Sequence, residues 1–261
     1  MRIAAAGDNC IDYYDETGTC FCGGNSVNVA VYTVRLGNDA SYIGAVGDDK
    51  FGTLMCDGLN QKSVDISHIK VLHGSTALTH VSLVNGDRVF TRYDEGVMGN
   101  FKLTEADIQF IHSHDLFVSG FWGRTINDLE QIKAGGILTA FDFATKLDDP
   151  TVIPACRFVD YPFFSYDEGR DEYIEDFMKQ VSATGSKVVS VTMGVKGSLC
   201  YDGSEFYSFG LIPCRVVDTM GAGDSYISGF LKGVLERKAI PECMKMGAEN
   251  AAVTLQYSGA W

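Results

Sequence analysis

Short apolar runs alternate with longer amphipathic segments along most of the chain. The apolar runs, which we expect to be strands, are residues 3–6, 41–46, 116–119, 137–143, 158–161 and 187–192. The amphipathic segments, which we expect to be helices, are residues 25–36, 51–61, 125–134, 167–183, 221–237 and 241–256. A strand that is apolar throughout is buried on both faces, as in a parallel sheet covered by helices. The pattern therefore predicts an α/β fold.

Two segments depart from this alternation. Residues 77–84 and 88–93 are strand-like runs, and Asn85-Gly86 between them is a strong hairpin signal. A second hairpin is expected over 199–209. We interpret the first hairpin as part of a small sheet that stands off the main domain, as a lid does.

Composition narrows the class of protein. A formal net charge of −13 argues against a general binder of nucleic acid or of anionic membrane. Hydrophobic residues make up 46% of the chain, but no apolar stretch is long enough for a transmembrane helix, and no signal peptide is expected. The eight cysteines form no C-x-x-C pair, so a structural zinc site is not expected. These features predict a reduced, cytoplasmic protein.

The strongest chemical signal is the run D-T-M-G-A-G-D over residues 218–224, directly before an expected helix. Glycines at a helix N-terminus leave backbone N–H groups free to bind a phosphoryl group. Asp224 would lie beside them and could accept the proton of an attacking hydroxyl group. The alternative is a glycine-rich turn in which Asp224 only complements the helix dipole.

A second glycine pair, Gly23-Gly24, also precedes an expected helix. Asn28 follows one turn into that helix and could present its amide to a polar ligand. The alternative is a tight turn in which Asn25 or Ser26 caps the helix.

Together and in this order, the two motifs resemble the signatures of the ribokinase-like (PfkB) carbohydrate kinase family. The resemblance runs from Gly7 to about Gly259 and implies one kinase domain over residues 1–261. It implies a three-layer α-β-α fold with a mostly parallel central sheet, and a small β lid formed by about residues 12–22 and 77–97. It also implies an enzyme that transfers the γ-phosphoryl group of ATP to a primary sugar hydroxyl.

The resemblance carries roles over to matching positions. Asp224 matches the family's general base, and Gly221, Ala222 and Gly223 match its anion hole. The expected sugar contacts are Asp12, Gly24 and Asn28, with Arg92 at the end of the first hairpin as a further candidate. The expected nucleotide contacts are Thr192, Gly194 and Gly197 in a T-x-G-x-x-G turn, and Asn250 near the adenine. Arg92 could instead belong to a solvated strand end.

Two positions concern cations. The family's N-x-x-E motif, whose acidic end organises magnesium, is matched by residues 165–168, where Ser165 replaces the amide and Glu168 keeps the carboxylate. Mg²⁺ needs few protein ligands, so Glu168 could hold it through water. Asp218 and the Met220 carbonyl match part of a monovalent-cation loop, so K⁺ is a candidate cofactor.

The N-terminal stretch, residues 7–24, resembles that of family members that phosphorylate fructosamines, which implies fructoselysine as the acceptor. The alternatives are another sugar or nucleoside, such as fructose or ribose, or a nucleotide-binding protein that has lost catalysis. Phe121, Trp122 and Arg124 follow an expected strand at the sheet edge where ligands bind. We expect one of the three to contact the substrate. Lid strands pair between subunits in many relatives, so the resemblance makes a homodimer a candidate assembly, whereas a lid that closes only over its own domain would equally permit a monomer.

Overall fold

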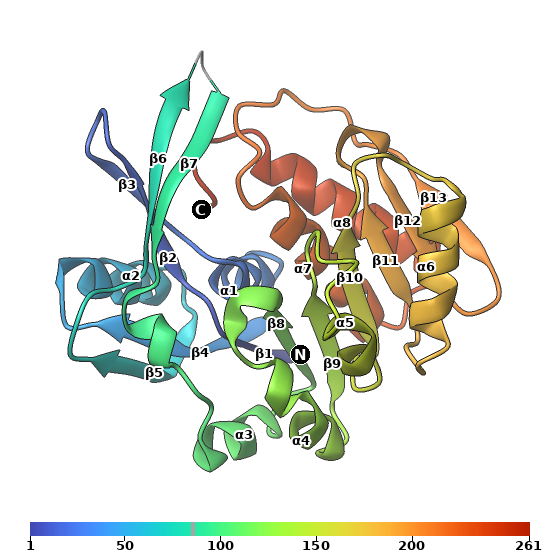
Figure 1. Ribbon diagram of the computed structural model, residues 1–261, viewed down its shortest axis with the longest axis horizontal. Coiled ribbons are helices and arrows are strands. Elements are labelled where there is room, and N and C mark those ends of the chain that lie inside the picture. The colour runs from blue at the N-terminus through green and yellow to red at the C-terminus, as the bar shows by residue number, and fades with distance from the viewer. Residues whose placement is uncertain (85–86) are drawn as a thin grey trace.

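The computed structural model describes residues 1–84 and 87–261, and it contains two β-sheets (Figure 1). The turn predicted at Asn85-Gly86 lies outside the described residues. In order across the large sheet, the strands are β13 (Phe206–Phe209), β12 (Ser198–Tyr201), β11 (Val189–Thr192), β10 (Tyr161–Ser165), β9 (Leu138–Asp142), β8 (Leu116–Gly120), β1 (Arg2–Ala6), β4 (Asp39–Gly47) and β5 (Asp65–Leu72). Neighbours from β11 to β5 pair in parallel, whereas β12 and β13 are antiparallel, as expected for residues 199–209.

Helices cover both faces of this sheet. They are α1 (Asn25–Arg35), α2 (Lys50–Gln61), α3 (Glu105–Ile111), α4 (Leu129–Ala134), α5 (Val152–Cys156), α6 (Glu172–Ser182), α7 (Ala222–Leu235) and α8 (Ile240–Thr254). Strand β1 shows why two layers are needed. Ala4 and Ala6 pack into one apolar cluster with α3 to α6, and Ile3 and Ala5 pack into another with α1, α2, α7 and α8. The predicted α/β class and the three-layer fold are confirmed. No helix in the described part of the chain is both long and apolar enough to cross a membrane.

The second sheet has four strands, in the order β3 (Thr19–Gly23), β2 (Cys10–Tyr14), β6 (Leu78–Val84) and β7 (Asp87–Asp94). The β6–β7 pair rises away from the main sheet, and the C-terminus lies near it (Figure 1). These strands come from the two segments that the sequence analysis assigned to a lid.

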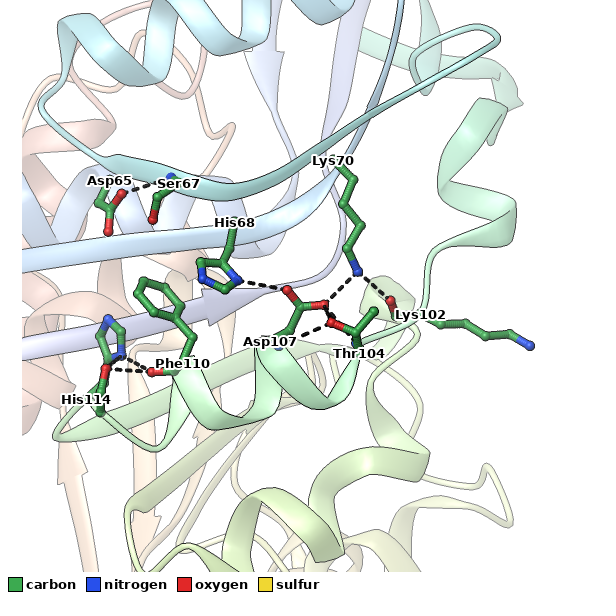
Figure 2. Close-up of polar contacts among 10 residues, drawn as sticks. Asp65, Ser67, His68, Lys70, Lys102, Thr104, Asp107, Phe110 and His114 are labelled. Carbon is green, nitrogen blue, oxygen red and sulfur yellow. Dashed lines mark hydrogen bonds and ion pairs between the residues drawn. The ribbon is translucent and has the colours of Figure 1, made fainter.

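A polar cluster joins β5, at the edge of the large sheet, to α3 (Figure 2). Asp107, the third residue of α3, forms a capping box with Thr104. Its two carboxylate oxygens also accept hydrogen bonds from Lys70 Nζ at 2.6 Å and from His68 Nδ1 at 2.9 Å, both on β5. Burial alone would raise the pKa of Asp107, but the bonds from His68, Lys70 and Thr104 hold that pKa well below its usual range. The cluster therefore pins this edge strand to its covering helix.

Three predicted elements were misplaced. The strand expected at 158–161 is wrong, because Phe158 and Val159 close a turn after α5 and the strand itself is β10. The helix expected from 167 begins only at Glu172, where the Asp171 carboxylate caps it by accepting from Ile174 N at 2.9 Å. The helix expected over 125–134 divides into the 3₁₀ turn η3 (Ile126–Asp128) and the short α4.

Candidate active site

The central strand β1 is where the chain order of the sheet reverses. Along the chain, the next strand that joins this sheet is β4, which lies on one side of β1. The strand after that on the other side of β1 is β8. Ligands of open α/β sheets bind beyond the carboxyl ends of the strands at such a switch point. Asp8 follows β1 there, and Asp142 ends β9, the strand beyond β8.

The glycine-rich motif forms the N-terminus of α7, as expected. Gly221 caps the helix with a left-handed backbone (φ 71°), and a Cβ there would lie 2.3 Å from the Tyr32 hydroxyl oxygen. Glycine is therefore required at this position. A Cβ on Gly223 would meet nothing within 4 Å, so this turn is open to an approaching group. The first N–H groups of a helix have no intrahelical partner, so this end of α7 suits an anion.

Asp224, the third residue of α7, is held by two amides of α1. Asn28 Nδ2 donates to its Oδ2 at 2.7 Å, and Asn25 Nδ2 donates to its Oδ1 at 2.7 Å. Burial raises the pKa of Asp224 to about 7, the bond from Asn28 opposes this, and the charges of Asp142 and Asp8 add to it. A carboxyl group with a pKa near neutrality suits a general base.

Asn25 joins Asp224 to a second carboxylate. The same Nδ2 donates to Asp142 Oδ2 at 2.8 Å, while Asp142 Oδ1 accepts from Ala144 N. Both carboxylates are acceptors, so the donor side of the Asn25 amide must face them. Burial and the charge of Asp8 raise the pKa of Asp142 to about 6. Within the described residues, Asp224 and Asp142 have amide partners but no ion pair with a Lys or Arg side chain.

The predicted sugar contacts occupy three different settings. Asn28 is buried beside Asp224, and its Oδ1 accepts from Trp261 Nε1 at 2.9 Å. Gly24 precedes α1 with φ 110°, and a Cβ there would lie 2.6 Å from the Asn9 Cα. Asp12 is buried on β2 in the lid, where its Oδ1 lies 3.7 Å from Cys10 Sγ.

Arg92 lies on the lid strand β7 and is largely exposed. Its guanidinium binds Asp94 on the same strand, with Nη2 2.8 Å from Asp94 Oδ1. The structure therefore places Arg92 in an ion pair along the lid edge, and its contact with substrate stays a prediction.

The predicted nucleotide turn follows β11. Thr192 ends that strand, and its hydroxyl oxygen lies 3.2 Å from that of Ser165 at the end of β10. Gly194 and Gly197 both have left-handed backbones, and a Cβ on Gly197 would clash with the Phe209 carbonyl oxygen at 2.2 Å. The glycines thus form a tight turn at the end of the sheet.

Asn250 is buried between α7 and α8, and its amide is engaged on both sides. Its Oδ1 accepts from Arg35 Nη2, and its Nδ2 donates to the Ser225 carbonyl, both at 2.7 Å. This arrangement braces the two helices, and the expected adenine contact stays a prediction.

The carboxylates at the two predicted cation positions differ in exposure and in hydrogen bonding. Glu168 is exposed in the turn after β10, where its carboxylate suits a water-mediated contact with Mg²⁺. Both oxygens of Asp218 already accept backbone bonds, from Met220 N at 2.8 Å and from Gly259 N at 2.7 Å. Among the described residues, no group of three or more His, Cys, Asp or Glu side chains could hold a metal ion.

Three residues of the site, Asp8, Asp142 and Trp261, were not predicted from the sequence. Asp8 accepts from Asn25 N at 2.8 Å, which ties the turn after β1 to the start of α1. The available signal was positional, because Asp8 and Asp142 each stand at the carboxyl end of an apolar run. Trp261 gave no such signal.

Comparison with known proteins shows the family to which the chain belongs. The model of the pfkB family carbohydrate kinases matches residues 6–261. The chain is 43% identical to fructoselysine 6-kinase of Escherichia coli (strain K12), over 99% of each chain. It is 35% identical to fructosamine kinase FrlD of Bacillus subtilis (strain 168), over 100% of this chain and 93% of the relative.

Solved structures share the fold. The ribokinase of Arabidopsis thaliana in complex with ribose and ATP superposes with a TM-score of 0.86 at 21% identity, covering 99% of this chain and 93% of that one. A putative ribokinase II of E. coli with ATP and Mg²⁺ also gives 0.86, at 20% identity, covering 99% and 94%. The chain belongs to the pfkB family of carbohydrate kinases and is a phosphotransferase that acts on a carbohydrate.

Proposed function

We propose that this protein transfers the γ-phosphoryl group of ATP to the primary hydroxyl of fructoselysine and forms fructoselysine 6-phosphate. The observation that carries the proposal is Asp224, a carboxylate with amide partners and a pKa of about 7 in the first turn of α7. The choice of acceptor is supported by the names of the relatives, which are 43% and 35% identical over nearly the whole chain.

In this mechanism the hydroxyl oxygen of the sugar attacks the γ-phosphorus, and the bond from that phosphorus to the ADP oxygen breaks. Asp224 accepts the hydroxyl proton. Asn25 and Asn28 fix both oxygens of that carboxylate in place before the reaction. The N–H groups at Gly221–Gly223 and the dipole of α7 stabilise the charge on the phosphoryl oxygens.

The remaining site residues have supporting roles in the proposal. Asp12, Gly24, Asn28 and Arg92 bind the sugar, and Thr192, Gly194, Gly197 and Asn250 bind the nucleotide. Glu168 holds Mg²⁺ through water, and the ion neutralises phosphate charge when it is bound. The lid excludes water that would otherwise hydrolyse ATP.

The proposal includes three further features. A K⁺ ion would have to use carbonyl oxygens such as that of Met220, since both Asp218 oxygens accept backbone bonds. The lid sheet has two edge strands, β3 and β7, through which a homodimer could form. A cytoplasmic location is supported by the cysteines, all of which are free thiols.

The test is coupled ADP release with Mg·ATP and a panel of acceptors: fructoselysine, fructose, ribose, adenosine and a control without acceptor. We expect strong turnover on fructoselysine and little on the others. Preferred turnover on a plain sugar or on adenosine would overturn the choice of acceptor and favour another sugar or nucleoside kinase. ATP binding without turnover on any acceptor would favour a non-catalytic nucleotide-binding protein.

A further inference from the structure

The segment that follows β8 lies directly on the candidate active site. Gly120 contacts the Asn25 side chain so closely that a Cβ there would lie 2.5 Å from Asn25 Oδ1. Gly123 packs on the turn after β1, because a Cβ on Gly7 would lie 2.5 Å from the Gly123 Cα. The 3₁₀ turn η2 (Phe121–Gly123) and the residue after it are therefore held beside the carboxylates, at the outer side of the site.

Arg124, the residue after η2, has a backbone that a side-chain-bearing residue seldom adopts. Its φ is +57°, in the left-handed region, which costs on the order of 1 kcal/mol for a residue other than glycine. Such conformations persist where the surroundings enforce them, and they concentrate at functional sites. Here the left-handed turn directs the guanidinium toward Glu95, at the end of the lid strand β7.

The Arg124–Glu95 ion pair leaves half of each group available. Arg124 Nε and Nη2 both donate to one oxygen, Glu95 Oε1, at 2.9 and 2.5 Å. Among the described residues, neither Arg124 Nη1 nor Glu95 Oε2 has a hydrogen-bond partner. The two side chains are 41% and 43% exposed. The pair is thus partly exposed, with a guanidinium and a carboxylate side by side.

Aromatic residues lie close in sequence to both members of the pair. Trp122 is 51% exposed and meets Phe121 edge to face, with ring centroids 6.0 Å apart. Tyr93, two residues before Glu95, is half-exposed. Burial, followed by the charges of Cys10 and Asp8, raises the pKa of Tyr93 to about 12. Trp122 and Tyr93 thus expose aromatic surface in the two segments that carry the ion pair.

The acceptor of the proposed reaction has matching chemistry. Fructoselysine joins its sugar to the ε-nitrogen of lysine, and four methylene groups separate that nitrogen from an α-ammonium and an α-carboxylate. A planar guanidinium suits a carboxylate, a carboxylate suits an ammonium group, and an exposed indole suits methylene groups. We propose that Arg124 and Glu95 bind the α-carboxylate and the α-ammonium of the acceptor, with Trp122 along its methylene chain. This inference rests on the proposed function and names the part of the site that would distinguish fructoselysine from a free sugar.

A different role for the pair is a latch between lid and main domain, because Glu95 belongs to the lid side and Arg124 to the large sheet. A latch would affect every acceptor equally. A binding site for the amino acid would affect only acceptors that carry the group concerned. Substrate analogues therefore separate the two roles.

The experiment compares kcat/KM for three acceptors that share the sugar and the chain. They are fructoselysine, fructosylcadaverine (no carboxylate) and 6-(fructosylamino)hexanoate (no α-ammonium). We expect each deletion to lower kcat/KM of the wild-type enzyme by about tenfold or more, the usual effect of losing a charge-assisted hydrogen bond. In Arg124→Gln, fructoselysine and fructosylcadaverine should become nearly equal. In Glu95→Gln, fructoselysine and the hexanoate should become nearly equal.

Two further variants serve as controls. Arg124→Lys keeps the charge but loses the planar fork, so its preference for the carboxylate should be intermediate. Lys179→Gln breaks an exposed ion pair with Asp176 on α6 and should leave all three values unchanged. Equal losses on all three acceptors in Arg124→Gln, with the wild-type preference retained, would overturn the inference in favour of a latch. Equal wild-type rates on all three would overturn the inference alone, whereas turnover on none would overturn the proposed function with it.

Discussion

Asp224 and Asp107 occupy the same helical position in two regions of the molecule, yet their environments are opposite. Each is the third residue of its helix. Asp107 is held by Lys70, His68 and Thr104, and its pKa is lowered. Asp224 is held by the amides of Asn25 and Asn28, near two other carboxylates, and its pKa is raised to about 7. A cation fixes the charge of the first carboxylate. The second is buried and has no ion pair with a Lys or Arg among the described residues, so it can exchange a proton near neutral pH.

The largest expected effect is on catalysis. Asp224→Asn removes the proton acceptor, so kcat with fructoselysine should fall by about 10³-fold, within the usual range for a general base. Calorimetric titration should show that ATP binding is kept. Asp107→Asn is the matched control at the same helical position and should keep kcat. Turnover by Asp224→Asn at the wild-type rate would exclude Asp224 as the base.

The free energy of unfolding should change in opposite directions in Asp224→Asn and Asp107→Asn. The folded state binds the proton of Asp224 more tightly than the unfolded state does, so the wild type loses stability as pH rises from about 4 to about 7. Asp224→Asn should then be more stable than the wild type at pH 8, on the order of 2 kcal/mol.

For Asp107 the sign is reversed. The pKa of Asp107 is lower in the folded state than in the unfolded state. The ionised carboxylate therefore stabilises the folded state above the unfolded pKa, and this stabilisation is lost only as pH falls far below the unfolded pKa. Asp107→Asn should cost about 2 kcal/mol at pH 8, because Lys70 and His68 lose an anionic partner. Urea unfolding measures both free energies. A shift of both variants in the same direction would contradict the comparison.

A smaller effect is expected from the amide that the two site carboxylates share. Asn25→Ala removes one hydrogen bond from Asp224 and one from Asp142, which raises the pKa of both. At pH 7 kcat/KM should fall about tenfold, the usual worth of a hydrogen bond to a charged group. At pH 9, where both carboxylates are ionised, the loss should shrink. An equal loss at both pH values would mean that Asn25 positions the carboxylates without changing their pKa.

The smallest expected effect concerns the polar cluster around Asp107. Lys70→Met removes the ammonium that binds Asp107 but leaves His68 and Thr104, so unfolding free energy should fall by about 1 kcal/mol. Lys179→Met, in an exposed pair on α6, should change it by less. Urea unfolding at low and high salt should show that the Lys70 effect shrinks with ionic strength. A larger loss in Lys179→Met would contradict the account.

Much of the fold could be predicted from the sequence, because strands buried on both faces are continuous apolar runs. Strand β5 and helix α3 were missed for the opposite reason. Strand β5 lies at the sheet edge and carries His68 and Lys70, and α3 is short and held by the Asp107 cluster. Their stability depends on contacts between distant segments, which local patterns do not contain.

The residues of the candidate site also differ in how far the sequence predicts them. Asp224 and its glycines could be predicted, since helix-terminal chemistry needs neighbouring residues in one motif. For Asp142 the sequence offers only its position at the end of an apolar run, because its link to Asp224 passes through Asn25 across more than a hundred residues of chain. Nor does the sequence show that both ends of the Asn250 amide are engaged within the chain.

Burial raises the pKa of Asp224, and the charges of the nearby carboxylates raise it further, since no Lys or Arg ion pair offsets them in the described part of the chain. The decisive measurement of the carboxylate effect is the pH dependence of kcat/KM in the wild type and in Asp142→Asn, with the same substrates and buffers so that substrate ionisation cancels. The groups that act on Asp224 are Asp142, Asp8 and the amides of Asn25 and Asn28. We expect a wild-type acidic limb near pH 7 and a shift of about one unit to lower pH in the variant. Superimposable profiles would contradict it.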